Sequence, residues 1–282
     1  MTTRILLIAR NAFRGIMSRR ALYIWAGAVL LMFFRAAPQI VAGFRGPERV
    51  REFMLSGAVA GSLEVWAFLC LAAAIFLGAG SVATELTTRT IVTVMARPVH
   101  RWELLVGKWL GVSAFAMVTL AIGVVLAYGL GSYVGVDVDR LTLVILREAL
   151  AQSIVAIVLY SGVAVVLGSF GSWVIGAGVT VLLAFLPVLV NELKAIDDSP
   201  NWQRVGITLD WMTPDGYVSY YPRLNKVPFP GTPQRPAPPA VPQREDTRDL
   251  HRPLYASLAY AALYFLAGCA AFTRRNINLT SG

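Results

Sequence analysis

Charged residues are scarce in this sequence. Asp, Glu, Lys and Arg together make up 15% of its 282 residues, whereas hydrophobic residues make up 56%. An ordinary soluble domain has about 25% charged and about 45–50% apolar residues. The apolar residues also gather in blocks of about 20, the length of helix that crosses roughly 30 Å of hydrocarbon. This composition excludes an ordinary soluble domain and predicts an integral membrane protein.

Cysteine and histidine are scarce as well, with two of each. Cys70 and Cys269 both fall inside apolar blocks, which excludes a disulfide framework or a zinc site with the usual ligand spacing. His100 and His251 are far apart, and the sequence contains neither an H-E-x-x-H motif nor a G-x-x-x-x-G-K-[ST] phosphate loop. We therefore expect no catalytic residue, metal or cofactor in this chain. A stand-alone membrane enzyme is the least favoured function.

Six apolar blocks are long enough to span a membrane. Backbone amides in lipid must be hydrogen-bonded within the chain, so these spans are predicted to be α-helices. They lie at Ala21–Val41, Ala58–Val82, Trp109–Leu130, Ala149–Gly168, Trp173–Val190 and Leu254–Phe272. We predict an all-α integral membrane protein with six transmembrane helices, five of them within residues 21–190.

The first apolar block has a second interpretation. Residues Ala21–Phe34 have the length of the apolar core of a signal peptide, and the small residues Ala36 and Ala37 follow them. The preceding residues disfavour this interpretation, because they form a long patterned segment rather than a short basic leader.

Lys and Arg are distributed unequally between the two sides of the predicted bundle. If the N-terminus is inside, the inner side holds 11 of these residues and the short outer segments hold 6. An excess in short loops marks the cytoplasmic side, and long loops do not count. We therefore predict a multi-pass protein of the plasma or inner membrane with both termini cytoplasmic. The formal net charge of +9 reflects this topology, so nucleic acid is not an expected partner.

Residues 1–20 precede the first span and have helical periodicity. Within Thr3–Arg19, one face is apolar and carries Ile5, Ile8, Ala9, Ala12, Phe13 and Ile16. The opposite face carries Arg4, Asn11, Arg14 and Ser18. This pattern is typical of an amphipathic helix in the cytoplasmic membrane interface. The alternative is a basic flank that only anchors the first span to anionic lipid.

Two ionisable residues, Arg35 and Glu64, are predicted at membrane depth, near the outer ends of the first and second spans. A charge inside a span indicates a functional site by default, although a residue near an end can also extend toward the headgroups. We favour an ion pair between Arg35 and Glu64. Separate extension of each side chain toward the headgroups and a substrate site are the alternatives.

Residues 191–253 form the one long segment outside the predicted spans. Asn201–Tyr221 is rich in Trp and Tyr, which settle at headgroup level. Pro222–Pro253 contains nine prolines, which prevent regular helix and favour extended polyproline conformation. We expect a stiff or disordered outer spacer, and a binding site for an extracytoplasmic partner is the alternative. Residues 254–282 would then form the sixth span and a short cytoplasmic tail.

The segment between the second and third spans, residues 83–108, has the most distinctive sequence. A run with helical period begins at Glu85 and is ended by Pro98. A new helix is predicted after the proline and runs into the third span, with Lys108 at headgroup height. In order, the segment contains Glu85, Arg89-Thr90, Pro98-Val99-His100-Arg101 and Gly107-Lys108.

This series resembles the corresponding loop in the membrane subunits of type-2 ABC exporters, the ABC-2 permeases. Their loop typically carries a glutamate, a Gly-Thr pair, Pro-Val-x-Arg, and Gly-Lys at the start of the third span. Arg89 departs from the pattern, because a glycine is usual at that position. The layout of the whole chain is also similar, from the amphipathic N-terminal helix to the outer aromatic segment before the last span.

The resemblance implies one permease of an exporter, paired with a second copy or a related chain. Two cytoplasmic ATPase subunits, which bind ATP and Mg²⁺, would drive it by pushing on the segment 83–108. The residues assigned to this coupling are Glu85, Arg89, Arg97, Pro98, Arg101 and Lys108. The implied function is outward transport of an unidentified substrate. The alternative is transmission of force to an extracytoplasmic partner.

Overall fold

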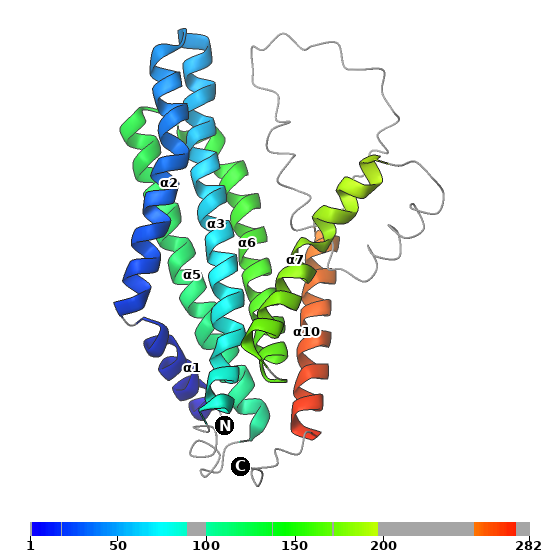
Figure 1. Cartoon of the computed structure of the whole chain (residues 1–282). Coiled ribbons are helices and arrows are strands. Elements are labelled where there is room, and N and C mark those ends of the chain that lie inside the picture. Colours follow the sequence, from blue (N-terminus) through cyan, green and yellow to red (C-terminus); the bar gives the residue numbers. More distant parts are fainter. Residues whose placement is uncertain are drawn as a thin grey trace. The chain divides into compact units, whose positions relative to one another are not determined.

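The computed structural model of the chain describes residues 2–17, 19–88, 100–136, 138–170, 172–196 and 251–274. Its helices are α1 (Thr2–Ile16), α2 (Arg19–Arg45), α3 (Glu48–Thr87), α5 (Arg101–Val134), α6 (Val138–Gly168), α7 (Trp173–Ile196) and α10 (His251–Arg274) (Figure 1). The first is the predicted amphipathic helix, and each of the other six contains one predicted span. The prediction of an all-α chain is confirmed for the described residues.

Three described helices are long and apolar enough to cross a membrane, over Trp25–Arg45, Gly57–Thr87 and Arg101–Val134. Helices α6, α7 and α10 contain shorter apolar stretches, at Ser153–Gly168, Trp173–Leu186 and Ala262–Phe272. Helix α3 has 40 residues. A helix of that length measures about 60 Å, roughly twice the thickness of the hydrocarbon layer. The helix is therefore longer than the span Ala58–Val82 that its apolar residues predict.

The chain divides into two compact units. The first comprises Met1–Leu182 and Ala261–Gly282, and the second comprises Leu183–Tyr260. In the second unit, the described residues are the end of α7, up to Ile196, and the start of α10, from His251. The predicted aromatic segment and nearly all of the proline-rich segment lie outside the described residues.

Helix α3 is central in the first unit and packs against α2, α5 and α6 (Figure 1). Small residues allow the close approach of α6. A Cβ atom on Gly168 of α6 would overlap the backbone of Ala79 on α3. A Cβ atom on Gly78 of α3 would lie 3.1 Å from the carbonyl oxygen of Ser161 on α6. Contacts of this kind stabilise helix pairs in lipid, where the hydrophobic effect does not drive their association.

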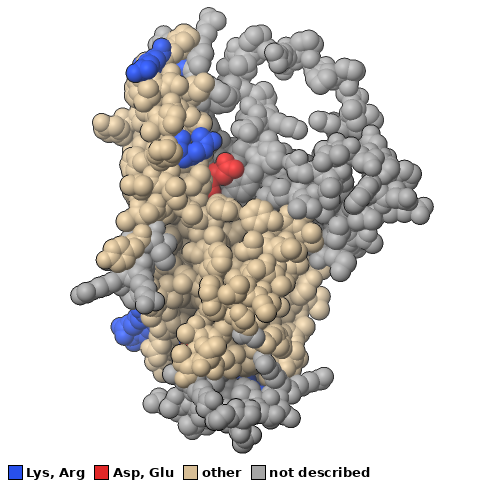
Figure 2. Space-filling view, viewed as in Figure 1, with Lys and Arg blue, Asp and Glu red and all other residues tan. Residues whose placement is uncertain are grey.

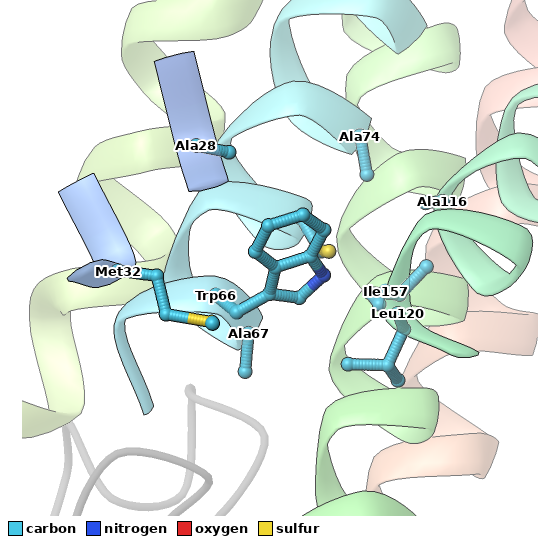
Figure 3. Packing of buried hydrophobic residues seen from close by; sticks show 9 residues of the cluster. Ala28, Met32, Trp66, Ala67, Ala74, Ala116, Leu120 and Ile157 are labelled. Atoms are coloured by element: carbon cyan, nitrogen blue, oxygen red, sulfur yellow. The ribbon is translucent and has the colours of Figure 1, made fainter. Parts of the chain in front are cut away.

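The centre of the core is Trp66 of α3, which is 1% exposed. It packs with Ala28 and Met32 of α2 and with residues of α5 and α6 (Figure 3). Its indole N–H donates a hydrogen bond to the carbonyl oxygen of Thr119 on α5, at 2.7 Å. A Cβ atom on Gly123 of α5 would overlap the indole ring, so this position must remain a glycine for the ring to fit.

Helix α5 ends in a glycine cap. Gly135 has φ of 75°, in the left-handed region. Its N–H donates to the carbonyl oxygen of Ser132 at 3.3 Å, and the N–H of Val136 donates to that of Gly131 at 3.1 Å. This pair of hydrogen bonds is the Schellman motif, which satisfies carbonyl groups at the end of a helix.

Most of the described surface carries no charge on the face that Figure 2 shows. Large apolar side chains are exposed on several helices, including Tyr23, Leu30, Phe34, Val125 and Leu263. A soluble protein rarely exposes so continuous an apolar surface. This surface suits contact with lipid tails.

Candidate functional site

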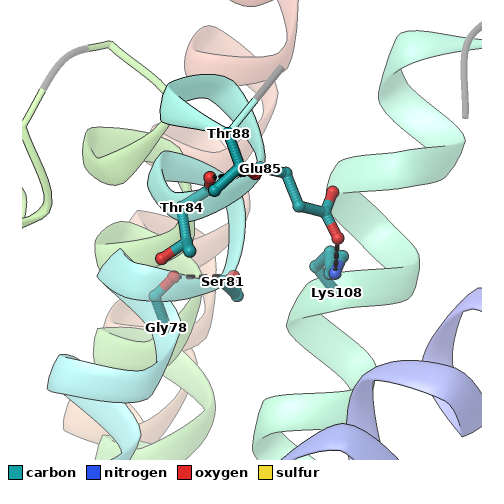
Figure 4. Close-up of polar contacts among 6 residues, drawn as sticks. All are labelled: Gly78, Ser81, Thr84, Glu85, Thr88 and Lys108. Carbon is teal, nitrogen blue, oxygen red and sulfur yellow. Dashed lines mark hydrogen bonds and ion pairs between the residues drawn. The ribbon is translucent and has the colours of Figure 1, made fainter. Parts of the chain in front are cut away.

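The end of α3 and the start of α5 are joined by a salt bridge. We call these segments, residues 84–88 and 100–111, the α3–α5 junction. The ammonium of Lys108 donates a hydrogen bond to Oε1 of Glu85 (Figure 4). The Lys108 side chain is 14% exposed and that of Glu85 is 24% exposed, so the pair is partly shielded from water. Two residues that the sequence assigns to ATPase coupling are therefore bound to each other.

Glu85 belongs to α3 and does not begin a separate helix. The periodicity predicted a new helical run from this residue, but α3 continues to Thr87. Its last turn is closed by Thr88, whose N–H and hydroxyl both donate to the carbonyl oxygen of Thr84, at 3.0 and 2.7 Å. No proline or glycine interrupts the chain between the span and Thr87, so the helix of the span simply extends to that residue.

Helix α5 begins at Arg101, close behind the predicted proline break. His100 precedes the helix, and its backbone N–H donates to Oε2 of Glu103 at 3.0 Å. Glu103 is 1% exposed. Its carboxylate lies in the first turn, where the helix dipole favours a negative charge and a backbone N–H needs an acceptor. This cap fixes the start of α5.

The remaining predicted coupling residues divide into two groups. Arg101 lies at the first position of α5 and is half-buried. Arg89, Arg97 and Pro98 lie outside the described residues, so their assignment stays a prediction.

An apolar cluster directly adjoins the junction and connects it to other helices. Its buried members are Val82, Leu104, Leu105, Val165, Val166, Phe265 and Phe272, from α3, α5, α6 and α10. Ile8 of α1 and Leu86 of α3 pack against the same cluster. A movement at the junction would therefore be transmitted to α1 and α10, because packed cores transmit strain.

Helix α1 packs on the start of α5 with the apolar face that its sequence predicts. All six residues of that face are half-buried, whereas Arg4, Arg10 and Arg14 are exposed. Gly107 and Gly111 of α5 make room for it. A Cβ atom on Gly107 would lie 2.6 Å from Cγ2 of Ile8, and one on Gly111 would lie 2.7 Å from Cβ of Ala12. The apolar face of α1 is thus partly covered by α5.

Aromatic rings continue this contact toward α2. The ring of Phe115 on α5 lies edge to face with Phe13 of α1, at 6.3 Å between centroids, and is stacked on Trp25 of α2 at 6.1 Å. The indole N–H of Trp25 donates to the hydroxyl of Thr119 at 3.2 Å. The position of α1 is therefore linked through one ring to α2 and α5.

A comparison with protein-family models matches residues 6–276 to the family described as ABC-2 family transporter protein. The chain belongs to the ABC-2 transporter family. The match covers nearly the whole sequence, so the resemblance seen at the loop extends from α1 to α10. A search of curated proteins finds no match.

As an ABC-2 membrane component, the chain is a multi-pass integral membrane protein. Membership in the family also implies a partner ATPase, which hydrolyses ATP. Within the described chain, the α3–α5 junction contains three of the residues assigned to ATPase coupling, Glu85, Arg101 and Lys108, and that assignment stays a prediction. Its Gly107 and Lys108 have distinct structural roles, since the glycine makes room for α1 and the lysine binds α3.

Arg35 and Glu64 lie on the neighbouring helices α2 and α3 of this ABC-2 protein. The Arg35 guanidinium approaches Gly61, one helical turn before Glu64. No direct salt bridge joins them in the described structure. Their assignment as a membrane ion pair stays a prediction.

Several residues at the junction are not in the motif that the sequence analysis used. Glu103 caps α5, but its partner is His100 rather than the Ser or Thr of a typical capping box. Gly111 contacts α1, and the signal for it in the sequence is the spacing Gly107-x-x-x-Gly111. The contact between Phe13 and Phe115 has no signal in the sequence, because it joins residues far apart in the chain.

Proposed function

We propose that this chain is the permease subunit of an ATP-driven exporter and moves a substrate outward through a bundle of six transmembrane helices. The observation that carries the proposal is the α3–α5 junction. There, a salt bridge, a helix cap and an apolar cluster connect the coupling segment to α1, α6 and α10. A push on this segment is therefore converted into movement of several helices.

In this proposal the junction faces the cytoplasm, together with both termini. The excess of Lys and Arg on that side supports the orientation. The ATPase binds the loop between α3 and α5 and the exposed basic face of α1, which carries Arg10 and Arg14. The Glu85–Lys108 pair joins the end of α3 to the first turns of α5, so that a push on one helix is passed to the other.

The proposal also includes a second permease, either another copy or a related chain, because ABC exporters work with two membrane halves. The exposed apolar side chains of the described helices offer enough surface for both lipid and a partner subunit. ATP and Mg²⁺ are bound by the ATPase subunits, and this chain contributes no catalytic group.

The experiment is a detergent pull-down of the tagged chain from its native membrane, followed by identification of the proteins that come with it. We expect an ATPase with a phosphate-binding loop. We expect its recovery to fall at least tenfold in the double variant Glu85→Ala, Arg101→Ala. The control is Gly129→Ala, on an open part of α5 where a Cβ atom meets nothing within 4 Å.

A monodisperse preparation without any ATPase would contradict the proposed function. Equal recovery of the ATPase with the wild-type chain and the double variant would instead remove Glu85 and Arg101 from the contact. Transport direction is tested separately with inside-out vesicles of the same strain, in which an exporter accumulates its substrate upon addition of ATP.

A further inference from the structure

Polar groups gather on the α2–α3 surface within the apolar stretches of both helices. Arg35 is at the midpoint of the apolar stretch Trp25–Arg45, and Glu64 lies inside the stretch Gly57–Thr87. The guanidinium of Arg35 lies across α3, with Cζ and Nη2 4.0 Å from the position of a Cβ atom on Gly61. Arg35 therefore turns toward the neighbouring helix, one helical turn before Glu64.

Two further polar features of α2 lie within one helical turn of Arg35. Pro38 lies inside α2 and has no N–H, so the carbonyl oxygen of Phe34 lacks its donor within the helix. The side-chain oxygen of Gln39 is buried and has no hydrogen-bond partner among the described residues. The Gln39 oxygen is enclosed by protein, so the groups open to a ligand are Arg35 and Glu64. We call these two residues the α2–α3 polar cluster.

Lipid tails cannot satisfy these groups. A charged residue inside a membrane helix is costly, and such residues characteristically face water-filled cavities or bind polar partners. Arg35 and Glu64 are both exposed, and the described residues contain no salt bridge between them. Next to them the surface is open, because a Cβ atom on Gly57 would meet nothing within 4 Å. The cluster thus has two charged groups that are not bound to each other, and the surface beside them has space for a ligand.

We propose that the α2–α3 polar cluster binds a zwitterionic group made of a primary ammonium and a phosphate or carboxylate. The guanidinium of Arg35 binds the anion, since its N–H donors match the geometry of phosphate and carboxylate oxygens. The ammonium binds the Glu64 carboxylate. We expect a primary ammonium, because its N–H groups can donate hydrogen bonds to the carboxylate oxygens, whereas a quaternary ammonium has no N–H group.

Two sources offer this chemistry. One is the headgroup of phosphatidylethanolamine in the surrounding leaflet, and the other is a free solute such as phosphoethanolamine. Binding at the cluster is independent of the proposed export function. The further conclusion that such a group is the transported cargo rests on that function.

The test is native mass spectrometry of the purified complex with its ATPase. The complex is titrated with short-chain phosphatidylethanolamine, short-chain phosphatidylcholine and free phosphoethanolamine. We expect the ethanolamine lipid to bind at least tenfold more tightly than the choline lipid. Arg35→Gln and Glu64→Gln should each weaken its binding about tenfold. Comparable binding of free phosphoethanolamine identifies a solute site, whereas binding of the lipid alone identifies a headgroup site, and both support the proposal.

The matched control is Arg51→Gln, which removes an exposed arginine near the start of α3 whose Cζ lies 4.9 Å from the Phe44 ring centroid. This variant should bind like the wild-type chain. Equal affinity for the two lipids, or an equal loss of binding in Arg51→Gln, would overturn the proposal. If Arg35→Gln fails to assemble, two measurements still test the proposal. They are the ratio of the affinities for the two lipids on the unmodified chain and the binding of the ethanolamine lipid to the Glu64→Gln variant. If the ATPase co-purifies but the chain shows no preference between the two headgroups, only the binding site at the cluster is overturned. If the chain shows the preference but no ATPase co-purifies, only the proposed function is overturned.

Discussion

The indole N–H of Trp66 on α3 donates a hydrogen bond to the carbonyl oxygen of Thr119 on α5, at 2.7 Å, in the centre of the bundle. The ring lies in the space above Gly123, which has no side chain to fill it. One hydrogen bond and one glycine therefore determine how closely α3 and α5 pack at this level.

The first prediction concerns this glycine. Gly123→Ala places a methyl group inside the indole ring of Trp66, so the helices must separate. We expect a loss of about 1–3 kcal/mol in the free energy of unfolding, as for an overpacked core. Thermal unfolding in one detergent, followed by tryptophan fluorescence, measures this loss. Gly129→Ala on the same helix is the control and should be neutral or slightly stabilising, and equal behaviour of the two variants would disprove the packing argument.

The second prediction concerns the contact between α1 and α5. In Gly111→Ala, the new methyl group lies 2.7 Å from Cβ of Ala12 and from the carbonyl oxygen of Ala9, so α1 is displaced. We expect amide hydrogen exchange in residues 2–16 to accelerate at least tenfold, while exchange in α3 stays unchanged. Hydrogen exchange with mass spectrometry reports both. Wild-type protection of α1 in this variant would show that Gly111 does not hold the contact.

The third prediction concerns the salt bridge at the junction. Glu85→Gln, Lys108→Met and the double variant form a double-mutant cycle. We expect a coupling energy of about 1 kcal/mol, at the upper end of the range for exposed pairs, because both side chains are partly shielded. Thermal unfolding of the four proteins measures it. The exchanged pair Glu85→Lys, Lys108→Glu should recover part of the stability, and strictly additive single variants would mean that the two charges do not interact.

The fourth prediction concerns the close approach of α3 and α6. Gly168→Ala sets a methyl group against the backbone of Ala79, which cannot rotate away as a side chain can. We therefore expect a larger loss of stability than for Gly123→Ala, together with poor expression. Gly178→Ala on α7 is the control, since a Cβ atom there meets nothing within 4 Å. Fluorescence-detected size-exclusion chromatography after heating compares the three variants, and an unaffected Gly168→Ala would contradict the close contact.

The sequence predicted the helices well, because the physical signal is strong. Each predicted span lies inside a described helix, since lipid leaves the backbone few alternatives to helix. The helix ends were harder to predict. Helix α3 begins at Glu48, ten residues before the predicted start, because charged residues outside the hydrocarbon continue a helix as readily as apolar ones do.

The candidate site was predicted only in part. The loop motif singled out Glu85 and Lys108 for ATPase coupling, which stays a prediction. Their salt bridge could not be predicted, because it depends on how α3 and α5 lie beside each other, and periodicity does not contain that information. The basic and acidic residues of a loop also look the same in sequence whether they bind each other or another subunit. The apolar face of α1 was predicted residue by residue, yet its covering by α5 required the structure.

Helix α3 is uninterrupted over its 40 residues and contains no proline, whereas α2 beside it contains Pro38. An unbroken helix resists bending, so it acts like a rod of about 60 Å. If α3 tilts at Glu85, where it is bound to α5, its other end near Glu48 is displaced. This displacement is larger for a longer helix. Beside it, α2 can flex at its proline. Small displacements at the junction are thereby magnified at the opposite end of the bundle, and the two helices of the first hairpin respond to them differently.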